Sequence, residues 1–578
     1  MSSAFTSQFQ SPPKHGLTMG ELYDWHNQHN PEHPLFTYPG GDGKDTRITY
    51  SQFHDAYHRA GFIMAGLAGI NLNAHCDTYP VVAMLSTADT ISTFTTLVGI
   101  LRLGAVPFPI SPRYSARVVA TLMKNANARH LIVNAESNLR PLAEEAVTLL
   151  SGNKNSTPAQ LHFFPEFEAL YQSAWYPRIP KKHCTRFTTA IIIHSSSSSS
   201  DVPKVIPWSH RMQIQNSLVP VSHNNHKLDG AIFSCHSLEL FHTLGLLFLS
   251  WAPTTGMVIA TFKPSSPAIL PTPELCFEGI RETQAQYALT HTKFMEKWVH
   301  DENKILHLKT LGGIVAGGKI LKQSAGDILT RRGVLIGNIY GSTEGGVVSG
   351  LLPDYLGDDL WEYFQINPQC KMEFIDQGDG TYHGIVVPSE RQSPSLMNTT
   401  FDGSEAYATG DLMIPHPTRK DYWKVLGRID DSILLATGEV IHPVRPENII
   451  CSSTMVKSAQ LFGHARTHLG VLVELEDEAL YNLADIDEAR DMLWPSVELM
   501  NDEQPSFGKI AWKMILVASP EKGFIHTPKG APKRAQNLLL YQNEIDELYQ
   551  GSTDPYLARH ASSLPQPVTT TQVEQARL

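Results

Sequence analysis

Short apolar runs rich in β-branched residues recur along the first two thirds of the chain. They occupy residues 81–85, 130–133, 190–193, 231–233 and 313–315. Intervals long enough for helices separate these runs, and residues 95–103 have a helical pattern in one such interval. Strands that alternate with helices in this way are typical of α/β proteins with largely parallel sheets. We therefore expect an α/β fold with a large N-terminal domain of parallel-rich sheets flanked by helices.

The pattern of apolar and polar residues changes near Asp430. Apolar runs follow at residues 432–435 and 471–475, and a helical segment ends near Tyr549. We therefore expect a smaller, mobile α+β C-terminal domain. The predicted divisions are a disordered N-terminus (1–20), a large domain (21–429), a small domain (430–550) and a flexible tail (551–578). The Ser, Thr, Pro and Gln content of that last segment is typical of linkers and tails.

Composition narrows the class of protein. The 578 residues are too many for one hydrophobic core. Lys and Arg number 46 against 57 Asp and Glu, and the formal net charge of −11 argues against a general nucleic-acid binder. The six cysteines form no CxxC pair, which argues for a reducing compartment and against a disulfide framework or a zinc cluster. No uncharged apolar run approaches the roughly 18 residues that a membrane-spanning helix needs.

These features predict a cytoplasmic protein without a membrane span. The last three residues, Ala576, Arg577 and Leu578, are close to the Ser-Lys-Leu peroxisomal address. A chance ending on a tail is the alternative. The expected location is therefore the cytoplasm, or the peroxisome if this tripeptide is a targeting signal.

The most unusual local feature is a run of six serines after His194. It continues as Asp201-Val202-Pro203-Lys204 and follows the apolar run 190–193, so it leaves the carboxyl end of a predicted strand. Open α/β sheets bind ligands at such ends. Small residues let backbone N–H groups approach phosphate oxygens, and a lysine adds charge. The run predicts a phosphate-binding loop, with a flexible low-complexity loop as the alternative.

A second cluster is Tyr-Gly-Ser-Thr-Glu at residues 340–344. It does not fit the Gly-x-Ser-x-Gly pattern of a nucleophile elbow, because the serine is at the wrong place. The hydroxyl of Thr343 is suited to a phosphate, and the carboxylate of Glu344 to Mg²⁺, which prefers oxygen ligands. A capped turn is the alternative interpretation.

Three more clusters follow in order. Residues 407–411 place Asp411 after a glycine turn, where its carboxylate could bind ribose hydroxyls. Residues 427–431 read Gly-Arg-Ile-Asp-Asp at the change of texture and predict a hinge. Residues 527–530 place Lys529 on a Pro/Gly loop near the end of the folded region.

The order of these five motifs resembles that of the adenylate-forming superfamily. This group includes acyl-CoA ligases, luciferases and the adenylation domains of peptide synthetases, and the resemblance runs from about Ile48 to Tyr549. The stretch 107–113, the run 427–443 and Lys529-Gly530 are closer to one branch. That branch comprises the adenylation domains of fungal carboxylic acid reductases and their synthetase-like relatives.

The resemblance implies a role for each motif residue. It assigns the β- and γ-phosphates of ATP to Ser195, Ser196, Ser197, Ser198, Ser199, Ser200 and Lys204. It assigns the adenine pocket to Gly317, Gly318, Asn338 and Tyr340, with Tyr340 stacked on the base. It assigns the α-phosphate to Thr343, Mg²⁺ to Glu344, the ribose hydroxyls to Asp411 and the ribose or phosphate side to Arg428. It implies that His242 borders the acyl pocket, Asp430 is the hinge, and Lys529 bridges the substrate carboxylate and the α-phosphate.

The resemblance also implies a two-step reaction with ATP and Mg²⁺ as cofactors. A small carboxylic acid attacks the α-phosphorus of ATP to give acyl-AMP and pyrophosphate. The small domain then rotates at Asp430, withdraws Lys529 and admits a thiol, from coenzyme A or from the phosphopantetheine of a carrier protein. The C-terminal tripeptide favours a stand-alone ligase that uses coenzyme A. The branch resemblance favours a carrier thiol and the excised first domain of a longer reductase.

Two alternatives to an active enzyme remain open. The family's loop usually reads Ser-Gly-Ser-Thr-Gly, whereas Ser197 and Ser200 stand at both glycine positions. Where a positive φ is needed, serine costs on the order of 1 kcal/mol, so a catalytically silent nucleotide binder is one alternative. An interaction module that uses the tail is another.

The predicted acid pocket, at residues 233–245, 289–293 and 313–316, includes several histidines and a lysine, and we expect a small or functionalised acid.

Overall fold

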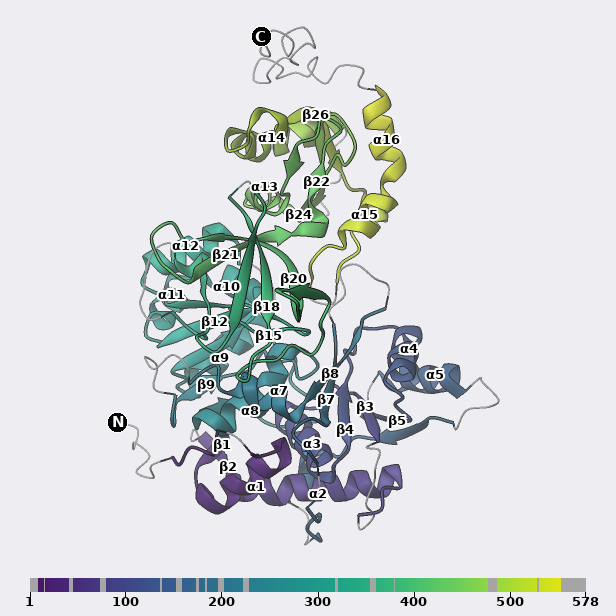
Figure 1. The fold of residues 1–578 in the computed structure, drawn as a ribbon, viewed down its shortest axis with the longest axis vertical. Helices are drawn as coiled ribbons and strands as arrows, with labels where there is room; N and C mark the ends of the chain where they lie inside the picture. The colour runs from purple at the N-terminus through teal and green to yellow at the C-terminus, as the bar shows by residue number, and fades with distance from the viewer. Residues whose placement is uncertain are drawn as a thin grey trace. The chain divides into compact units, whose positions relative to one another are not determined.

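The chain folds into two compact units. Unit 1 comprises Met1–Leu321, Ala325–Thr409 and Pro415–Lys424, and unit 2 comprises Lys322–Ser324, Gly410–Ile414 and Val425–Leu578. The structure is a computed structural model, drawn in Figure 1. It describes residues 9–14, 16–40, 45–72, 80–135, 138–151, 158–172, 176–181, 184–195, 202–221, 228–317, 321–353, 360–378, 380–476, 486–527 and 530–551. The predicted tail beyond residue 551 lies outside this range.

Two parallel-rich sheets form the framework of unit 1. The larger has the order β13 (Ile336–Ile339), β12 (Gly313–Gly317), β11 (Tyr287–Thr290), β9 (Ile232–Ser234), β10 (Val258–Ala260), β1 (Pro34–Pro39) and β2 (Asp45–Thr49). Its strands pair in parallel except for β2, which is antiparallel to β1. The smaller, all-parallel sheet has the order β4 (Val106–Pro109), β3 (Val81–Leu85), β5 (His130–Val133) and β6 (Gln160–Phe163). The predicted α/β class is confirmed.

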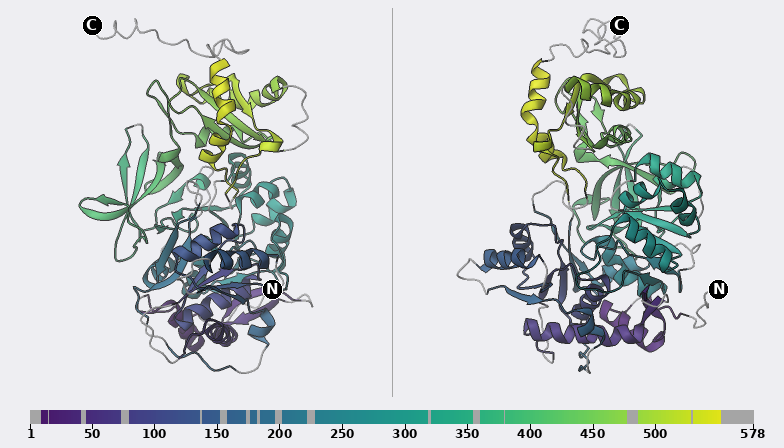
Figure 2. Two further views of the ribbon diagram at one scale, coloured as in Figure 1. Left: turned by 90° about the vertical axis from the view of Figure 1, so that its right-hand side faces the viewer. Right: turned by 180° about the vertical axis from the view of Figure 1, so that it is seen from behind.

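Helices lie between and around these strands. They are α1 (Met19–His29), α2 (Tyr50–Ala68), α3 (Thr90–Leu103), α4 (Ala116–Asn125), α5 (Arg140–Ser151), α6 (Phe167–Tyr171), α7 (His210–Ser217), α8 (Thr243–Thr255), α9 (Pro273–Glu282), α10 (Thr292–Trp298), α11 (Glu302–Leu308) and α12 (Gln323–Arg331). The helices α1, α2 and α3 pack against one another. Figure 1 draws α1 and α2 in purple and α3 in blue, and Figure 2 gives two further views of this region.

The remaining strands are shorter or antiparallel. One pair is β7 (Thr189–His194) with β8 (Val205–Ser209), and a second is β14 (Gly341–Ser342) with β15 (Gly346–Val347). A further sheet has the order β16 (Phe364–Gln365), β21 (Tyr422–Arg428), β20 (Ser404–Pro415), β18 (Tyr382–Val387) and β17 (Lys371–Asp376), with β19 (Thr399–Phe401) paired to β20. A 3₁₀ turn, η1 (Leu360–Glu362), precedes β16.

Unit 2 is an α+β unit with its own hydrophobic core. Its three-stranded sheet has the order β24 (Val456–Phe462), β25 (Leu469–Leu475) and β26 (Ile510–Val517). A 3₁₀ turn η2 (Ile429–Asp431) and the hairpin β22 (Ile433–Leu434) and β23 (Val440–Ile441) precede it. Its helices are α13 (Val444–Ile450), α14 (Ile486–Asp502), α15 (Arg534–Leu540) and α16 (Gln542–Gly551), with 3₁₀ turns η4 (Ser506–Gly508) and η5 (Pro520–Lys522).

Helix α3 is buried along nearly its whole length and defines the centre of the unit 1 core. The Asp89 side chain caps its first turn, and Gly104 ends it with a φ of 80°. Against α2, a Cβ on Gly61 would lie 2.7 Å from the carbonyl oxygen of Gly99. The two helices therefore pack backbone to backbone, which requires glycine at both positions.

The beginning of the chain differs from the prediction of disorder over residues 1–20. Phe9 is buried, and its ring stacks on that of His26 at 5.4 Å between centroids. Helix α1 begins at Met19 with a capping box, in which the side chain of Thr18 and that of Glu21 each bond the other's backbone N–H. The prediction does not hold for these residues, because one buried ring and a helix cap order a segment of polar composition.

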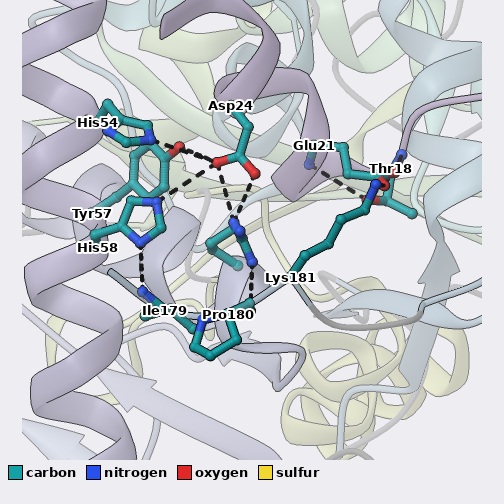
Figure 3. A network of polar contacts seen from close by, with 10 residues as sticks. Thr18, Glu21, Asp24, His54, Tyr57, His58, Ile179, Pro180 and Lys181 are labelled. Atoms are coloured by element: carbon teal, nitrogen blue, oxygen red, sulfur yellow. Dashed lines mark hydrogen bonds and ion pairs between the residues drawn. The ribbon is translucent and has the colours of Figure 1, made fainter. Parts of the chain in front are cut away.

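A polar network joins α1, α2 and α3 (Figure 3). Arg102 Nε lies 2.9 Å from Asp24 Oδ2, the hydroxyl of Tyr57 donates to Asp24 Oδ1 at 2.6 Å, and Arg102 also donates to the carbonyl of Pro180. Burial raises the pKa of Asp24, but bonds from His58 and the charge of Arg102 outweigh it and hold that pKa well below its usual range. The Arg102 side chain is buried, and this carboxylate compensates its charge.

The same network places Asp24, His54 and His58 with one metal-ligand atom each within 4.8 Å of one another. The guanidinium of Arg102 already neutralises the carboxylate. His58 Nδ1 accepts the backbone N–H of Ile179 at 2.9 Å, which uses one nitrogen of that ring. We therefore interpret this group as a structural ion-pair network.

Asp24→Asn is expected to destabilise unit 1 by about 3 kcal/mol, because it leaves the buried Arg102 guanidinium without a compensating charge. Urea unfolding followed by tryptophan fluorescence measures this change. The matched control is Asp55→Asn in α2, whose side chain is 64% exposed and whose expected effect is below about 0.5 kcal/mol. Equal effects of the two substitutions would contradict the prediction.

The buried His26 of α1 is expected to make the stability of the fold depend on pH. His26 Nε2 lies 2.5 Å from the carbonyl oxygen of Pro253, and Nδ1 lies 2.9 Å from the side-chain amide nitrogen of Asn30. Only the neutral ring with its proton on Nε2 satisfies both contacts. Burial lowers the pKa of His26 to about 3. The unfolded chain, with an ordinary histidine pKa of about 6.5, binds more protons between these values. Stability is therefore present above pH 6.5 and is lost as the pH falls toward 3.

Thermal unfolding between pH 7.5 and pH 4 tests this dependence. The free energy of unfolding is expected to fall by up to about 1.4 kcal/mol per pH unit for each such imidazole. His26→Gln keeps a donor but cannot titrate, so it is expected to reduce the slope. A slope that is identical in the variant would show that His26 does not carry the effect.

Candidate active site

The serine loop is closed at its base by reciprocal hydrogen bonds. The N–H of Ser195 donates to the carbonyl of Lys204 at 2.9 Å, and the N–H of Lys204 donates to the Ser195 hydroxyl at 2.9 Å. The predicted phosphate residues from Ser196 to Ser200 lie outside the described residues. The loop connects β7 to β8, which are antiparallel to each other, so it is the end of a hairpin rather than a strand-to-helix connection of a parallel sheet.

His194, the last residue of β7, anchors this base to a neighbouring segment. The ring is buried, and its Nε2 accepts the N–H of Ser111 at 3.1 Å. The proton is therefore assigned to Nδ1, which donates to the carbonyl of Ser195 at 3.1 Å. In the sequence His194 is only the residue before the serines, and nothing there indicates this partner 83 residues away.

The predicted α-phosphate residue lies against the amino end of α8. Thr343 Oγ1 is 2.8 Å from Oγ1 of Thr243, the first residue of that helix. The carbonyl of Thr343 accepts the indole N–H of Trp208 at 2.7 Å, which ties the turn between β14 and β15 to β8. The amino end of a helix carries partial positive charge and favours anions. The Thr243–Thr343 pair therefore places two hydroxyls where a phosphate is electrostatically favoured.

His242 immediately precedes α8 and occupies its N-cap position. Its Nε2 lies 3.3 Å from Oε2 of Glu239, and Arg113 forms an ion pair with the same carboxylate. A cleft of 280 Å³ is lined by Arg113, Glu239, Phe241 and Phe262, and His242 itself is not among its lining residues. Two of these belong to the segment 233–245 that was expected to line the acid pocket.

Two amide side chains hydrogen-bond to the strand that follows the turn of Thr343 and Glu344. Asn216 Oδ1 accepts the N–H of Val347 at 2.8 Å, and Gln392 donates to the carbonyl of Val347 at 2.9 Å. Gly346 has a φ of 80°, and a Cβ there would lie 2.9 Å from Asn216 Oδ1. Sequence reasoning missed both amides, because nothing in their local pattern distinguishes them from ordinary polar residues.

The predicted adenine-pocket residues meet at the ends of two neighbouring strands. In the parallel pair β12–β13, Gly317 is in register with Ile339, one residue after Asn338. Tyr340 follows, its N–H donates to the Ser349 hydroxyl at 2.8 Å, and its ring stacks on that of Phe364 at 4.5 Å between centroids. Gly318 lies outside the described residues. The structure thus places Gly317, Asn338 and Tyr340 at the ends of neighbouring strands, with Phe364 as an aromatic partner for Tyr340.

Three further predicted residues form a cluster within unit 2. Arg428 Nη1 lies 3.3 Å from Asp411 Oδ1, and Nη2 lies 3.8 Å from Asp430 Oδ2. Gly410 has a φ of 73°, and a Cβ there would meet the Arg428 guanidinium at 2.6 Å. Glycine at position 410 therefore lets Arg428 reach Asp411. Lys529 lies outside the described residues.

Two family profiles match these regions of the chain. The profile of the AMP-binding enzyme family matches residues 23–383, and that of the AMP-binding enzyme C-terminal domain matches residues 430–553. The chain belongs to the AMP-binding enzyme family. The resemblance to adenylate-forming enzymes is confirmed.

Curated relatives of this AMP-binding enzyme include fungal reductases. An adenylate-forming reductase of Heterobasidion annosum is 36% identical over 554 residues, which are 94% of this chain and 50% of the relative. A carboxylic acid reductase of Neurospora crassa is 24% identical over 94% of this chain and 52% of the relative. The chain spans about half the length of these curated relatives.

Solved structures share the fold of the AMP-binding enzyme. An anthranilate CoA ligase in complex with anthranoyl-AMP superposes with a TM-score of 0.68 at 16% identity, over 90% of this chain and 96% of that one. The O-succinylbenzoate CoA synthetase of Bacillus subtilis with AMP gives 0.68 at 14% identity, over 89% and 97%. Within the part of the chain that the structure describes, no helix has the length and apolar character to cross a membrane.

Gly346→Ala is expected to weaken ATP binding by roughly tenfold, because the new Cβ displaces Asn216 and with it the turn that carries Thr343. Isothermal titration with ATP measures the affinity. Gly403→Ala is the matched control, since Gly403 also has a positive φ (75°) but nothing lies within 4 Å of its added Cβ. Equal ATP affinity of the two variants would refute the role given to this close approach.

Proposed function

We propose that this AMP-binding enzyme activates a small carboxylic acid as an acyl-adenylate and then transfers the acyl group to a thiol. The observation that carries the proposal is the junction of Thr343, Thr243 and the amino end of α8, with His242 beside it. It offers hydroxyl donors and a helix dipole to a phosphate next to the residue predicted to border the acid. The names of the curated relatives, which are adenylate-forming reductases, support the first step.

In the first step one bond to phosphorus forms and another breaks. A carboxylate oxygen attacks the α-phosphorus of ATP, the bond from that phosphorus to the bridging oxygen of pyrophosphate breaks, and acyl-AMP and pyrophosphate result. Such chemistry depends on positioning and on neutralising charge. In the proposal, Thr343 and Lys529 contact the α-phosphate, and the serine loop with Lys204 holds the distal phosphates. Asp411 and Arg428 hold the ribose, and Gly317, Gly318, Asn338 and Tyr340 hold the adenine.

The residues present fit one magnesium ion. Glu344 offers a half-buried carboxylate, and its backbone is fixed because its carbonyl accepts the N–H of Ser395 at 2.7 Å. Mg²⁺ is typically held by one or two carboxylates together with substrate phosphates and water, so a single well-placed acid is sufficient. When bound, the ion offsets the negative charge of the phosphates.

The thiol acceptor is proposed to be carrier-bound phosphopantetheine, with coenzyme A as the second candidate. The reductases that resemble this chain are about twice its length, which favours an acyl group that is passed on within a longer assembly. The resemblance to CoA ligases in solved structures concerns the fold. In either case the acyl carbon exchanges its bond to AMP oxygen for one to sulfur, and AMP leaves.

The test is acid-dependent release of pyrophosphate across aromatic, aliphatic, amino and keto acids. Release is expected with one class of acid, and Lys529→Ala is expected to reduce it by roughly 10²- to 10³-fold, since a charge opposite the α-phosphate is lost. Lys513→Ala is the control, an exposed lysine of β26 in the same unit.

Three outcomes separate the alternatives. Release that is lost in Lys529→Ala and retained in Lys513→Ala supports adenylation. Binding of ATP without release for any acid would favour a silent nucleotide binder. Failure to bind ATP would mean that Ser197 and Ser200 cannot replace the usual glycines of the loop, and the catalytic proposal would fall.

A further inference from the structure

The loop that contains Lys529 has a closed base in unit 2. The N–H of Thr527 donates to the carbonyl of Ala531 at 2.7 Å, and the N–H of Lys533 donates to the carbonyl of Ile525 at 2.8 Å. The buried side chain of Asn537 accepts the N–H of Ile525 at 2.7 Å. The chain therefore enters and leaves the loop at fixed points, although Pro528 and Lys529 lie outside the described residues.

Arg534 begins α15 directly after this base and reaches into the interior of unit 2. Its Nη2 lies 2.5 and 2.6 Å from the two carboxylate oxygens of Glu447, on α13. Its Nη1 donates to the carbonyl of Leu461 at 2.9 Å, and the N–H of Leu461 donates to Glu447 at 2.6 Å. The guanidinium, the carboxylate and the end of β24 thus form one closed hydrogen-bonded group.

The same guanidinium also faces the turn η2. Arg534 Nε lies 3.6 Å from Oδ1 of Asp431, the neighbour of the predicted hinge residue Asp430. A single side chain therefore contacts the carboxylates of η2 and α13, and its own backbone continues the lysine loop. Burial opposes the charge of Arg534, but Glu447 and Asp431 raise its pKa and keep it protonated.

Stability alone is a poor explanation for this arrangement. Moving a guanidinium and a carboxylate out of water costs several kcal/mol per ion, and apolar residues of similar volume often stabilise a fold as well or better. What a bonded ion pair adds is direction, since guanidinium and carboxylate meet in few geometries. This pair joins the segment that follows the lysine loop to the hinge turn, so its geometry sets the direction of one relative to the other.

We propose that Arg534 is a positioning residue that holds the closed base of this loop, formed by Thr527, Ala531 and Lys533, in a fixed orientation relative to Asp431 and α13. The inference rests on the proposed function, in which Lys529 of this loop contacts the α-phosphate. Rotation at Asp430 then moves the base of the loop together with Asp431 and α13 as one body. Without the pair, the base of the loop is no longer fixed relative to the hinge.

Arg534→Lys tests the proposal, because it keeps the charge and loses the planar fork. The kcat of acid-dependent pyrophosphate exchange is expected to fall roughly tenfold or more, with the KM for ATP unchanged within about twofold. Hydrogen exchange of the peptide that spans residues 525–533 is expected to accelerate roughly tenfold, while exchange in β25 is unchanged. The combination of a kcat effect with local exchange distinguishes positioning from general loosening.

Two further variants guard against misfolding and surface effects. Glu447→Leu with Arg534→Met replaces the ion pair by apolar residues, so unit 2 is expected to keep its thermal stability while exchange at 525–533 accelerates and kcat falls as in Arg534→Lys. Arg445→Lys is the matched control: its side chain is 63% exposed and pairs with Glu503 at 2.7 Å in the same unit. It is expected to leave both measurements at wild-type values.

The outcomes separate this inference from the proposed function. Wild-type protein that shows no pyrophosphate exchange with any acid refutes the function, and the hydrogen-exchange comparison then judges the positioning role alone. Wild-type protection of residues 525–533 in Arg534→Lys overturns the inference. So does exchange that accelerates uniformly across unit 2, or a kcat loss that Arg445→Lys reproduces.

Discussion

The hydrogen bond between Thr243 and Thr343 joins the amino end of α8 to the turn between β14 and β15, and the candidate site depends on this junction. Helix α8 is almost entirely buried, so its dipole has a fixed direction. The turn closes the antiparallel pair β14–β15. The indole of Trp208 bonds the carbonyl of Thr343 in the turn, and the amides of Asn216 and Gln392 bond the backbone of Val347 in β15. Polar groups that are hydrogen-bonded in a dry interior have few alternative positions, which is how a loop acquires the precision of a helix.

The two loops predicted to contact phosphates share one construction. Each has its base closed by hydrogen bonds, Ser195 with Lys204 in unit 1 and Thr527 with Ala531 in unit 2. A hydrogen-bonding side chain lies next to each base: His194 bonds the carbonyl of Ser195, and Arg534 follows the second base and bonds Glu447 and Leu461. A closed base fixes the points at which the chain enters and leaves a loop.

The framework shows how little identity the fold requires. Solved structures at 14–16% identity share it with TM-scores near 0.68. In this chain the framework includes close approaches of backbone, such as that of Gly61 to Gly99. Networks such as Asp24 with Arg102 then lock the helices of this chain in its own way. Function is a separate question, because the same framework can hold different acids and pass them to different acceptors.

The sequence by itself determined the α/β class, the positions of strands such as β3 and β12, and the order of the five motifs, because burial and turn chemistry are written locally in residue type and spacing. Only the tertiary structure decided which side chains bond to one another around these motifs. Asn216 lies 131 residues from Val347, and Arg534 lies 87 residues from Glu447. A local pattern reports that a side chain is buried or polar, but its partner is chosen by the path of the chain in space, which no single segment encodes.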